Sequence, residues 1–532
     1  MESKKLLNTI FLLAITLSFL ATFAACTGEE AVNPTELSET GGETAPEETT
    51  YPEFIIEVTL DDGGRIYETM PNYVFIRDDE AMGVWQAVDI VYDTDDFTPG
   101  AQIYNGDFFW YKTVFFGDGK ILIWFESFER PIFTIAETWT KGYILTNDKF
   151  TMKYTTKKID NDIFLFIEDK PMFRNIDQPP IYRVFKKTSE KPEMMFDGYE
   201  DVRNADLSFA DFSNYPEHII ATFMFNDKTI FPPKDKMPDT DIFQPEYILE
   251  AGKNPGLGVR SIHEQGITGK GVSVAIIDFP MFYEHPEYKD KIIVEYTDEL
   301  RSFYHGPLVT SLLVGENIGT APGATVYYYG TNAGNVNDIE QADAAVYAEM
   351  LDMIIEKNKT LPEGEKIRVV SVSAAPTPQN DGVRGSWPNG EKYLESVERA
   401  REAGILVLDA SVENGIIGGC EYSNRGDRED VALCSIFDPG WGKREILAPM
   451  MSRTAAEVYQ EGDFLYSYSY NGGLSSAIPY AAGVLAMGWQ IRPELTADEM
   501  LQALIDTAHI GKDGDKFIYP TAFIEYLQKG IE

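Results

Sequence analysis

The sequence of 532 residues predicts two folded domains: a β-rich barrel or sandwich over residues 54–187 and a three-layer α/β domain with a parallel sheet over residues 256–532. Two observations separate them. Before residue 188, short runs of β-branched and aromatic residues alternate with turns and show no helical period, which is typical of antiparallel sheet. After residue 256, nearly all-apolar runs alternate with helical patterns, which is typical of parallel strands that are buried on both faces.

The first region contains the runs expected of short strands, over residues 54–60, 108–116, 121–125, 163–167 and 181–185. Gly117-Asp118-Gly119 lies between two of them and predicts a hairpin turn. The aromatic residues of this region include Trp110, Tyr111, Trp124 and Trp139. Such side chains can line a ligand cavity, but packing in a core is their commoner role, so we expect core.

Residues 188–255 form a bridging segment, in which Pro232, Pro233 and Pro238 indicate extended loop. In the α/β region, buried strands are predicted at 272–277, 325–329, 368–372 and 405–408. Amphipathic helices are predicted at 338–357, with Asn337 as N-cap, and at 390–403, followed by Gly404. Thr496 and Glu499 predict a capping box at the start of a later helix.

The N-terminus predicts a targeting segment over residues 1–26. Lys4 and Lys5 precede an apolar run from 6 to 23, and small residues precede Cys26. The segment resembles a bacterial lipoprotein signal, which implies lipidation of Cys26; an ordinary cleaved signal peptide is the alternative. Residues 27–53 are rich in Glu and Thr and contain no Lys or Arg, so they predict a disordered acidic tether. We therefore expect a lipid-anchored protein of the bacterial cell envelope, outside the cytoplasm.

Composition excludes some functions. A formal net charge of −41 repels nucleic acid and anionic lipid headgroups, so a nucleic-acid partner is not expected. Besides Cys26 the chain has Cys420 and Cys434, which could form a disulfide in an exported protein or remain thiols. There is no CxxC motif and no histidine cluster, so no metal site is assigned.

Candidate catalytic residues are Asp278, His305 and Ser475. Asp278 directly follows a buried apolar strand, His305 precedes an apolar helix, and Ser475 follows Gly472-Gly473 at the start of another helix. Free backbone N–H groups and the macrodipole favour developing negative charge at such a helix start. Each residue taken alone also has a plain structural explanation, such as an aspartate that caps a turn.

Together with their surroundings, these residues resemble the subtilisin-like serine proteases of peptidase family S8. Residues 266–278 (GITGKGVSVAIID) resemble the segment that leads to the family's catalytic Asp, and His285-Pro286 resembles the pair that follows it. His305-Gly306 with residues 321–324 (APGA) resembles the catalytic His helix and the entry to the next strand. Residues 473–483 (GLSSAIPYAAG) are similar to the nucleophile motif. The order Asp, His, Ser is that of subtilisin.

The resemblance implies a subtilisin-like fold from about residue 256 onward and an endopeptidase with a catalytic triad of Asp278, His305 and Ser475. It implies that residues 369–373 form the strand that pairs with substrate, with Ser373, Ala374 and Ala375 as substrate-binding residues. In the family an Asn side chain helps to hold the oxyanion. Counting without gaps puts Glu413 at that position, and a one-residue insertion puts Asn414 there; we favour Asn414, because a carboxylate would repel the oxyanion.

The sequence also departs from the family pattern. Phe279-Pro280 follows Asp278, Pro307 follows His305-Gly306, and Leu474 and Tyr480 replace the usual residues around Ser475. These departures leave an alternative open: a catalytically impaired relative that binds peptide or protein without turnover. A third hypothesis makes the β-rich domain the functional part, as an adhesin or ligand-binding module.

Protein or peptide substrates are the expected partners, and contact with the membrane is expected only through the lipid anchor. No cofactor is assigned. Structural Ca²⁺ stays a candidate, because exported enzymes of this kind often bind it, although no EF-hand-type loop occurs. The sequence assigns neither an oligomeric state nor a cleavage preference.

Overall fold

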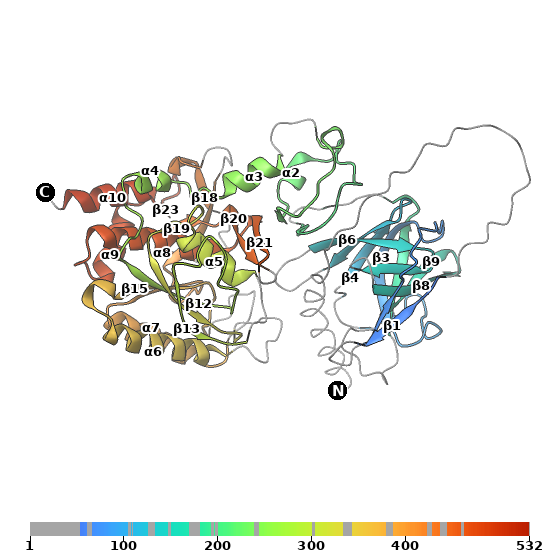
Figure 1. Ribbon diagram of the computed structural model, residues 1–532, viewed down its shortest axis with the longest axis horizontal. Helices are drawn as coiled ribbons and strands as arrows, with labels where there is room; N and C mark the ends of the chain where they lie inside the picture. Colours follow the sequence, from blue (N-terminus) through green and yellow to red (C-terminus); the bar gives the residue numbers. More distant parts are fainter. Residues whose placement is uncertain are drawn as a thin grey trace, which may run out of the picture. The chain divides into compact units, whose positions relative to one another are not determined.

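The computed structural model describes residues 54–60, 66–104, 108, 110–125, 133–146, 150–169, 181–192, 196, 200–238, 244–299, 304–333, 343–378, 387–422, 428–436, 444–458 and 462–530. The predicted signal segment with Cys26, the tether, and the predicted cap Asn337 lie outside these residues. The chain divides into two compact units between Met195 and Phe196 (Figure 1). None of the helices in the described part of the chain has the length and apolarity that a membrane span requires.

The N-terminal unit contains a closed antiparallel barrel. Strands β3 to β10 follow one another round the ring in chain order, and β10 pairs with β3 to close it. These strands are β3 (Gly83–Val91), β4 (Trp110–Phe115), β5 (Lys120–Phe125), β6 (Phe133–Thr140), β7 (Tyr143–Thr146), β8 (Phe150–Ile159), β9 (Asp162–Asp169) and β10 (Ile181–Ser189). A hairpin of β1 (Glu57–Leu60) and β2 (Ile66–Thr69) joins the sheet through β8. Of the two predicted alternatives, the structure has the barrel.

Side chains fill the interior of this barrel. Trp85, Phe115, Trp139 and Phe185 are fully buried in one apolar cluster. The core prediction is confirmed for Trp110, Trp124 and Trp139, whereas Tyr111 is only half-buried. The predicted turn is also present: between β4 and β5, Gly119 has a φ of 89° and its N–H donates to the carbonyl of Phe116. A positive φ is the reason for glycine at this position.

The C-terminal unit is built on a five-stranded parallel sheet in the order β13-β14-β12-β15-β16. Its strands are β12 (Ser273–Asp278), β13 (Ile292–Thr297), β14 (Thr325–Gly330), β15 (Ile367–Val372) and β16 (Leu406–Asp409). The predicted runs at 272–277, 325–329, 368–372 and 405–408 coincide with β12, β14, β15 and β16. Edge strand β13 was not predicted from the sequence.

Helices cover both faces of this sheet, which gives the predicted three layers (Figure 1). Val274 and Ile276 of β12 belong to one apolar cluster, and the alternate residues Ala275 and Ile277 belong to the other. The first cluster includes residues of α4 (Val259–Glu264), α5 (His305–Val314), α8 (Leu474–Ile491), α9 (Ala497–Asp506) and α10 (Pro520–Lys529). The second includes residues of α6 (Ala344–Thr360) and α7 (Gly390–Glu402).

Helix boundaries follow the local sequence signals. Gly404, with a φ of 78°, follows α7, and Thr496 and Glu499 form the predicted capping box of α9. Helix α6 begins at Ala344 with Asp343 as its N-cap, later than the predicted start at 338. Asp343 accepts a hydrogen bond from the backbone N–H of Ala345 and so satisfies one of the free donors of the first turn.

Two smaller sheets complete the C-terminal unit. One has the order β11-β21-β20, with β11 (Phe225–Asn226), β20 (Met451–Val458) and β21 (Phe464–Asn471). The other has the order β18-β17-β19-β23-β22, with β17 (Ile417–Tyr422), β18 (Cys434–Ile436), β19 (Ile446–Pro449), β22 (His509–Ile510) and β23 (Lys516–Phe517). Helices α2 (Glu217–Ile220) and α3 (Pro245–Gly252) come from the segment predicted as a bridge, which from residue 196 onward belongs to this compact unit.

Candidate active site

Asp278 is the last residue of β12, at the carboxyl end of the parallel sheet, and 5% of its surface is exposed. Its Oδ1 accepts two hydrogen bonds, from the backbone N–H of Phe279 at 2.8 Å and from Nδ1 of His305 at 2.7 Å. A buried carboxylate is tolerated only when donors surround it. These two donors meet that need and hold the imidazole in one orientation.

His305 is the first residue of α5, and its Nε2 lies 3.0 Å from Oγ of Ser475. Because Nδ1 donates to the Asp278 carboxylate, Nε2 of the neutral ring is the acceptor, and the Ser475 hydroxyl donates to it. Two aromatic rings stand nearly perpendicular to the imidazole. The ring centroid of Phe279 is 5.7 Å from that of His305, and the centroid of Tyr304 is 6.0 Å away.

Ser475 lies in the first turn of α8, directly after the connection from β21. Gly473, the N-cap of this helix, has a φ of 61°, which glycine adopts without strain, and its N–H donates to Oδ1 of Asn471. Backbone N–H groups in the first turn of a helix have no acceptor within the helix. The N–H of Ser475 is therefore placed where it can donate to an anion near the hydroxyl.

The structure thus brings together the three residues that the sequence singled out, from β12, α5 and α8. A hydroxyl that donates to a histidine, which in turn is held by a buried carboxylate, is an arrangement that can activate the hydroxyl as a nucleophile. It assembles at the carboxyl end of β12, where loops of an α/β sheet converge.

Both oxyanion candidates have hydrogen-bond partners within the protein. The side-chain amide of Asn414 donates to the carbonyl of Val407 at 3.0 Å, and the same side chain bonds to the carboxyl group of Asp409. Glu413 accepts a hydrogen bond from the hydroxyl of Thr377 at 2.9 Å. The oxyanion role of Asn414 therefore stays a prediction from the sequence.

The predicted substrate-binding residues follow β15 and are buried. Ser373 Oγ donates to the backbone carbonyl of Ser475 at 3.3 Å, which ties this segment to the nucleophile candidate. The carbonyl of Ala374 accepts from the N–H of Ala410, and the carbonyl of Ala375 accepts from the N–H of Thr377. Their substrate role also stays a prediction.

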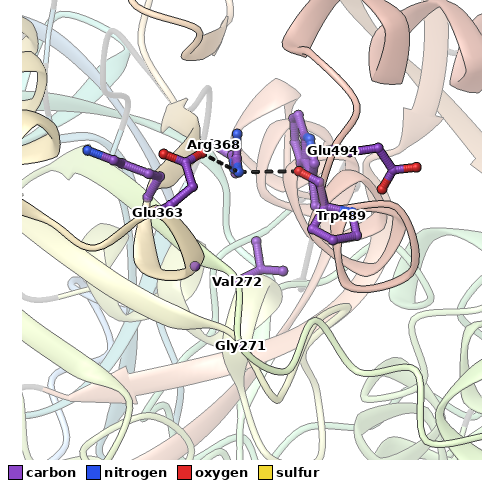
Figure 2. A pocket seen from close by; sticks show the side chains of 9 residues that line it. Gly271, Val272, Glu363, Arg368, Trp489 and Glu494 are labelled. Carbon is purple, nitrogen blue, oxygen red and sulfur yellow. Dashed lines mark hydrogen bonds and ion pairs between the residues drawn. The ribbon is translucent and has the colours of Figure 1, made fainter.

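A separate pocket of about 420 Å³ lies at the amino ends of β12 and β15, the opposite end of these strands from Asp278 (Figure 2). Gly271, Val272 and Trp489 are among its lining residues, and Arg368 lies between Glu363 and the Pro493 carbonyl. These two contacts measure 3.5 and 3.3 Å, so the guanidinium is only weakly held.

Cys420 and Cys434 are free thiols on the paired strands β17 and β18. Burial is the main cause that raises the pKa of the Cys420 thiol, and the neighbouring Cys434 adds to it. Among the described residues, no group of three or more His, Cys, Asp or Glu side chains is arranged to hold a metal ion.

Sequence reasoning did not single out Tyr304, although it stands beside His305 in space and in sequence. Nor did it single out Arg203, whose guanidinium lies over the Tyr304 ring. Tyr304 directly precedes His305 in the sequence, and this proximity could have indicated that it contacts the site. No local signal connects Arg203 to a residue that lies about one hundred positions later in the chain.

Comparison with known protein families finds a match within the C-terminal unit. Residues 269–415 match the model of the subtilase family, peptidase S8. Asp278 and His305 lie within the matched segment, and Ser475 lies beyond it. This segment is similar to the subtilases, a family of serine proteases.

Two relatives come from Bacillus subtilis strain 168. The chain is 25% identical to serine protease AprX over 293 residues, which are 48% of this chain and 65% of AprX. It is 25% identical to the minor extracellular protease Vpr over 187 residues, which are 35% of this chain and 21% of Vpr. The chain thus spans less than two thirds of the length of either relative.

Among solved structures, fervidolysin from Fervidobacterium pennivorans matches with a TM-score of 0.39 and 16% identity, over 52% of this chain and 45% of that chain. At this TM-score the likeness supports no conclusion about function.

Proposed function

We propose that this protein is a serine endopeptidase that hydrolyses peptide bonds in protein or peptide substrates, with Asp278, His305 and Ser475 as its catalytic triad. The observation that carries the proposal is the position of the His305 imidazole, 2.7 Å from the Asp278 carboxylate and 3.0 Å from the Ser475 hydroxyl. The match of residues 269–415 to the subtilase family supports the same reaction class.

In the proposed mechanism, Ser475 Oγ attacks the carbonyl carbon of the scissile bond while its proton passes to Nε2 of His305. Asp278 keeps Nδ1 protonated and stabilises the imidazolium that forms. The tetrahedral intermediate collapses, the C–N bond breaks, and His305 gives its proton to the leaving amine. An ester on Ser475 remains, and water cleaves it through the same steps. The Ser475 N–H is the proposed backbone donor to the oxyanion, with Asn414 as the predicted side-chain donor.

The test is labelling of Ser475 by a fluorescent fluorophosphonate, a reagent that reacts with activated serine hydroxyls. Wild type should be labelled and Ser475→Ala should not. Ser476→Ala is the matched control, because Ser476 is the next residue on α8 and its hydroxyl has only a weak contact, 3.5 Å from the Gly472 carbonyl. Labelling should survive in that variant. A folded wild type that the reagent leaves unlabelled would contradict the proposal.

A second candidate function is peptide binding without turnover. It is motivated by the hydrogen bonds of Asn414 to Val407 and of Glu413 to Thr377, because a site without a side-chain oxyanion donor loses much of its catalytic power. This candidate predicts that Ser475 reacts slowly or not at all, while a peptide aldehyde or substrate peptide still binds. Turnover of any peptide that depends on Ser475 would exclude it.

We also propose that the protein is lipid-anchored through Cys26 on the outer side of the cytoplasmic membrane of a bacterium. The support is the sequence of residues 1–26 alone. Cys26→Ser should move the protein from the membrane fraction to the soluble fraction of a cell lysate. It should also abolish incorporation of radiolabelled palmitate. Unchanged fractionation with unchanged labelling would contradict the anchor.

A further inference from the structure

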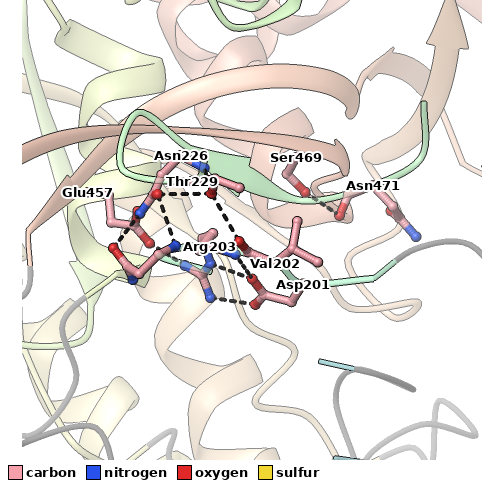
Figure 3. A network of polar contacts seen from close by, with 9 residues as sticks. Asp201, Val202, Arg203, Asn226, Thr229, Glu457, Ser469 and Asn471 are labelled. Carbon is pink, nitrogen blue, oxygen red and sulfur yellow. Dashed lines mark hydrogen bonds and ion pairs between the residues drawn. The ribbon is translucent and has the colours of Figure 1, made fainter. Parts of the chain in front are cut away.

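Arg203 belongs to the segment before the predicted protease domain and is held between two carboxylates. Its Nη2 and Nε lie 2.7 and 2.8 Å from the two carboxylate oxygens of Asp201, and its Nη1 donates to Oε1 of Glu457 in β20 (Figure 3). The side chain of Arg203 is 6% exposed and that of Glu457 is fully buried. A planar guanidinium that bonds to two carboxylates has little freedom to rotate.

The far side of Glu457 is also occupied. Asn226 donates from Nδ2 to Oε2 of Glu457 at 2.9 Å and to Oδ1 of Asn204 at 3.0 Å (Figure 3). Both oxygens of the buried carboxylate therefore have donors from the segment that precedes the protease domain. Such a network holds its members in fixed positions, because a partner that moves leaves a buried charge unpaired.

The guanidinium held in this way lies over the ring of Tyr304, with 4.9 Å between Cζ and the ring centroid. Cations are attracted to the face of an aromatic ring, so this contact fixes the position of the Tyr304 ring. That ring stands at 90° to the imidazole of His305. Phe279 stands against the same imidazole at 77°. Two aromatic rings thus contact the His305 ring, and Arg203 holds one of them.

The same segment supports the strand that leads to Ser475. Phe225 and Asn226 of β11 pair with Tyr468 and Ser467 of β21, and β21 ends four residues before Ser475. Ser469 Oγ donates to the carbonyl of Asn471, the last residue of that strand (Figure 3). The segment therefore contacts the structural elements on both the histidine side and the serine side of the site.

We propose that Arg203 is a positioning residue for His305 and acts through Tyr304, so that the segment around residues 201–230 is part of the working enzyme. The expected effect of Arg203 on the reaction rate rests on the proposed function. Its effect on the position of the His305 ring does not depend on turnover.

The kinetic test is a double-mutant cycle on the full-length protein, read as the second-order rate constant of fluorophosphonate labelling. Arg203→Met should lower this constant by about threefold to thirtyfold, the range that a cation–π contact allows. Tyr304→Leu should lower the rate constant by a similar factor, whereas Tyr304→Phe, which keeps the ring, should leave it near the wild-type value. In the Tyr304→Leu background, Arg203→Met should have no further effect on the rate. Independent, additive effects would overturn the proposal.

Two further variants separate positioning from stability. Lys228→Met is the matched control, because it removes a cation of the same segment whose ion pair, with Asp463, lies outside the network around Glu457. It should leave the rate constant unchanged. If Arg203→Met alone does not fold, Arg203→Met with Asp201→Asn and Glu457→Gln removes the cation from Tyr304 together with the charges of both carboxylates that hold it. A rate constant equal to wild type in that folded triple variant would overturn the proposal.

The test that is independent of turnover is NMR of the histidine Cε1–H groups in a Ser475→Ala background. The chain has five histidines, and His305→Gln identifies the resonance of His305. Arg203→Met should move this resonance toward its position in Tyr304→Leu, and Lys228→Met should leave it in place. If wild type is not labelled but the resonance moves, the proposed function fails and the positioning role stands. If wild type is labelled and the resonance does not move, the positioning role fails and the proposed function stands.

Discussion

The barrel of the N-terminal unit and the parallel sheet of the C-terminal unit both bury large apolar side chains, but they differ in where polar side chains gather. In the barrel, buried Asp89 accepts the backbone N–H groups of Ile103 and Tyr104, and so holds a loop. In the parallel sheet, Asp278 ends a strand and meets a histidine and a serine from other elements. In the part of the barrel that the structure describes, large apolar side chains fill the inside of the ring. An open parallel sheet collects loops at one end, and chemistry can gather there.

The largest expected effect comes from a substitution among the polar residues at the end of the parallel sheet, Asp278, His305 and Ser475. Asp278→Asn should lower kcat on a peptide substrate by about 10⁴-fold, because an amide no longer holds His305 in the tautomer that accepts from Ser475. Steady-state kinetics measures this, and an unchanged melting temperature would confirm that the fold is intact. A variant that keeps a tenth of the wild-type kcat would remove Asp278 from the triad.

A substitution in the core of the barrel should lower the stability of the barrel and leave the labelling rate of Ser475 unchanged. Trp139 is fully buried, and its Nε1 donates to the carbonyl of Phe116 at 2.9 Å. Trp139→Ala should lower the free energy of unfolding of the barrel by about 3–5 kcal/mol. Calorimetry would measure the loss, and the labelling rate of Ser475 should stay unchanged. Tyr92→Ala is the matched control, since Tyr92 is 57% exposed and its removal should change neither quantity. A fall in labelling rate would mean that the site depends on the barrel.

A smaller effect tests the predicted oxyanion donor. If Asn414 has that role, Asn414→Ala lowers kcat by about 10²–10³-fold with little change in KM. If the amide serves only its bonds to Val407 and Asp409, kcat stays constant and the unfolding free energy falls by about 1 kcal/mol. Glu413→Gln is the control, because it keeps the oxygen that accepts from Thr377 and removes the charge. Peptide kinetics and thermal melting together distinguish the two roles.

The smallest expected effect concerns pH and a histidine outside the site. His285 is fully buried; its Nε2 donates to the Leu465 carbonyl, and its Nδ1 accepts from the N–H of Glu287. Burial is the main cause that lowers the pKa of His285. Below about pH 6.5 the unfolded chain therefore binds this proton more readily than the folded chain does, and stability falls as the pH falls. His285→Gln should show a smaller drop in melting temperature between pH 7.5 and 5 than wild type. An equal drop would assign the acid sensitivity to other groups.

The elements that could be predicted from the sequence are those whose own residues carry a recognisable pattern. The strands of the parallel sheet were predictable because they are nearly all apolar, and the contacts among Asp278, His305 and Ser475 because their motifs resemble one family. Strand β8 was not predicted, because its sequence (FTMKYTTKKI) mixes threonine and lysine with few apolar residues. Closure of the barrel depends on β10 pairing with β3, which are distant in the chain. The burial of Glu457, in a strand of otherwise ordinary composition, likewise depends on Arg203, 254 residues earlier.

The pairing of β11 with β21 has a practical consequence for the choice of expression fragments. The resemblance to the family suggests an expression fragment that begins near residue 256. That fragment would lack Arg203 and Asn226 and would leave the Glu457 carboxylate buried without these donors, which costs about 3–5 kcal/mol when one partner of a buried pair is lost. It would also expose the edge of β21, a ready template for aggregation. A fragment that begins at Phe196 keeps the strand, the cation and the amide, and should therefore stay folded under conditions in which the fragment from residue 256 aggregates.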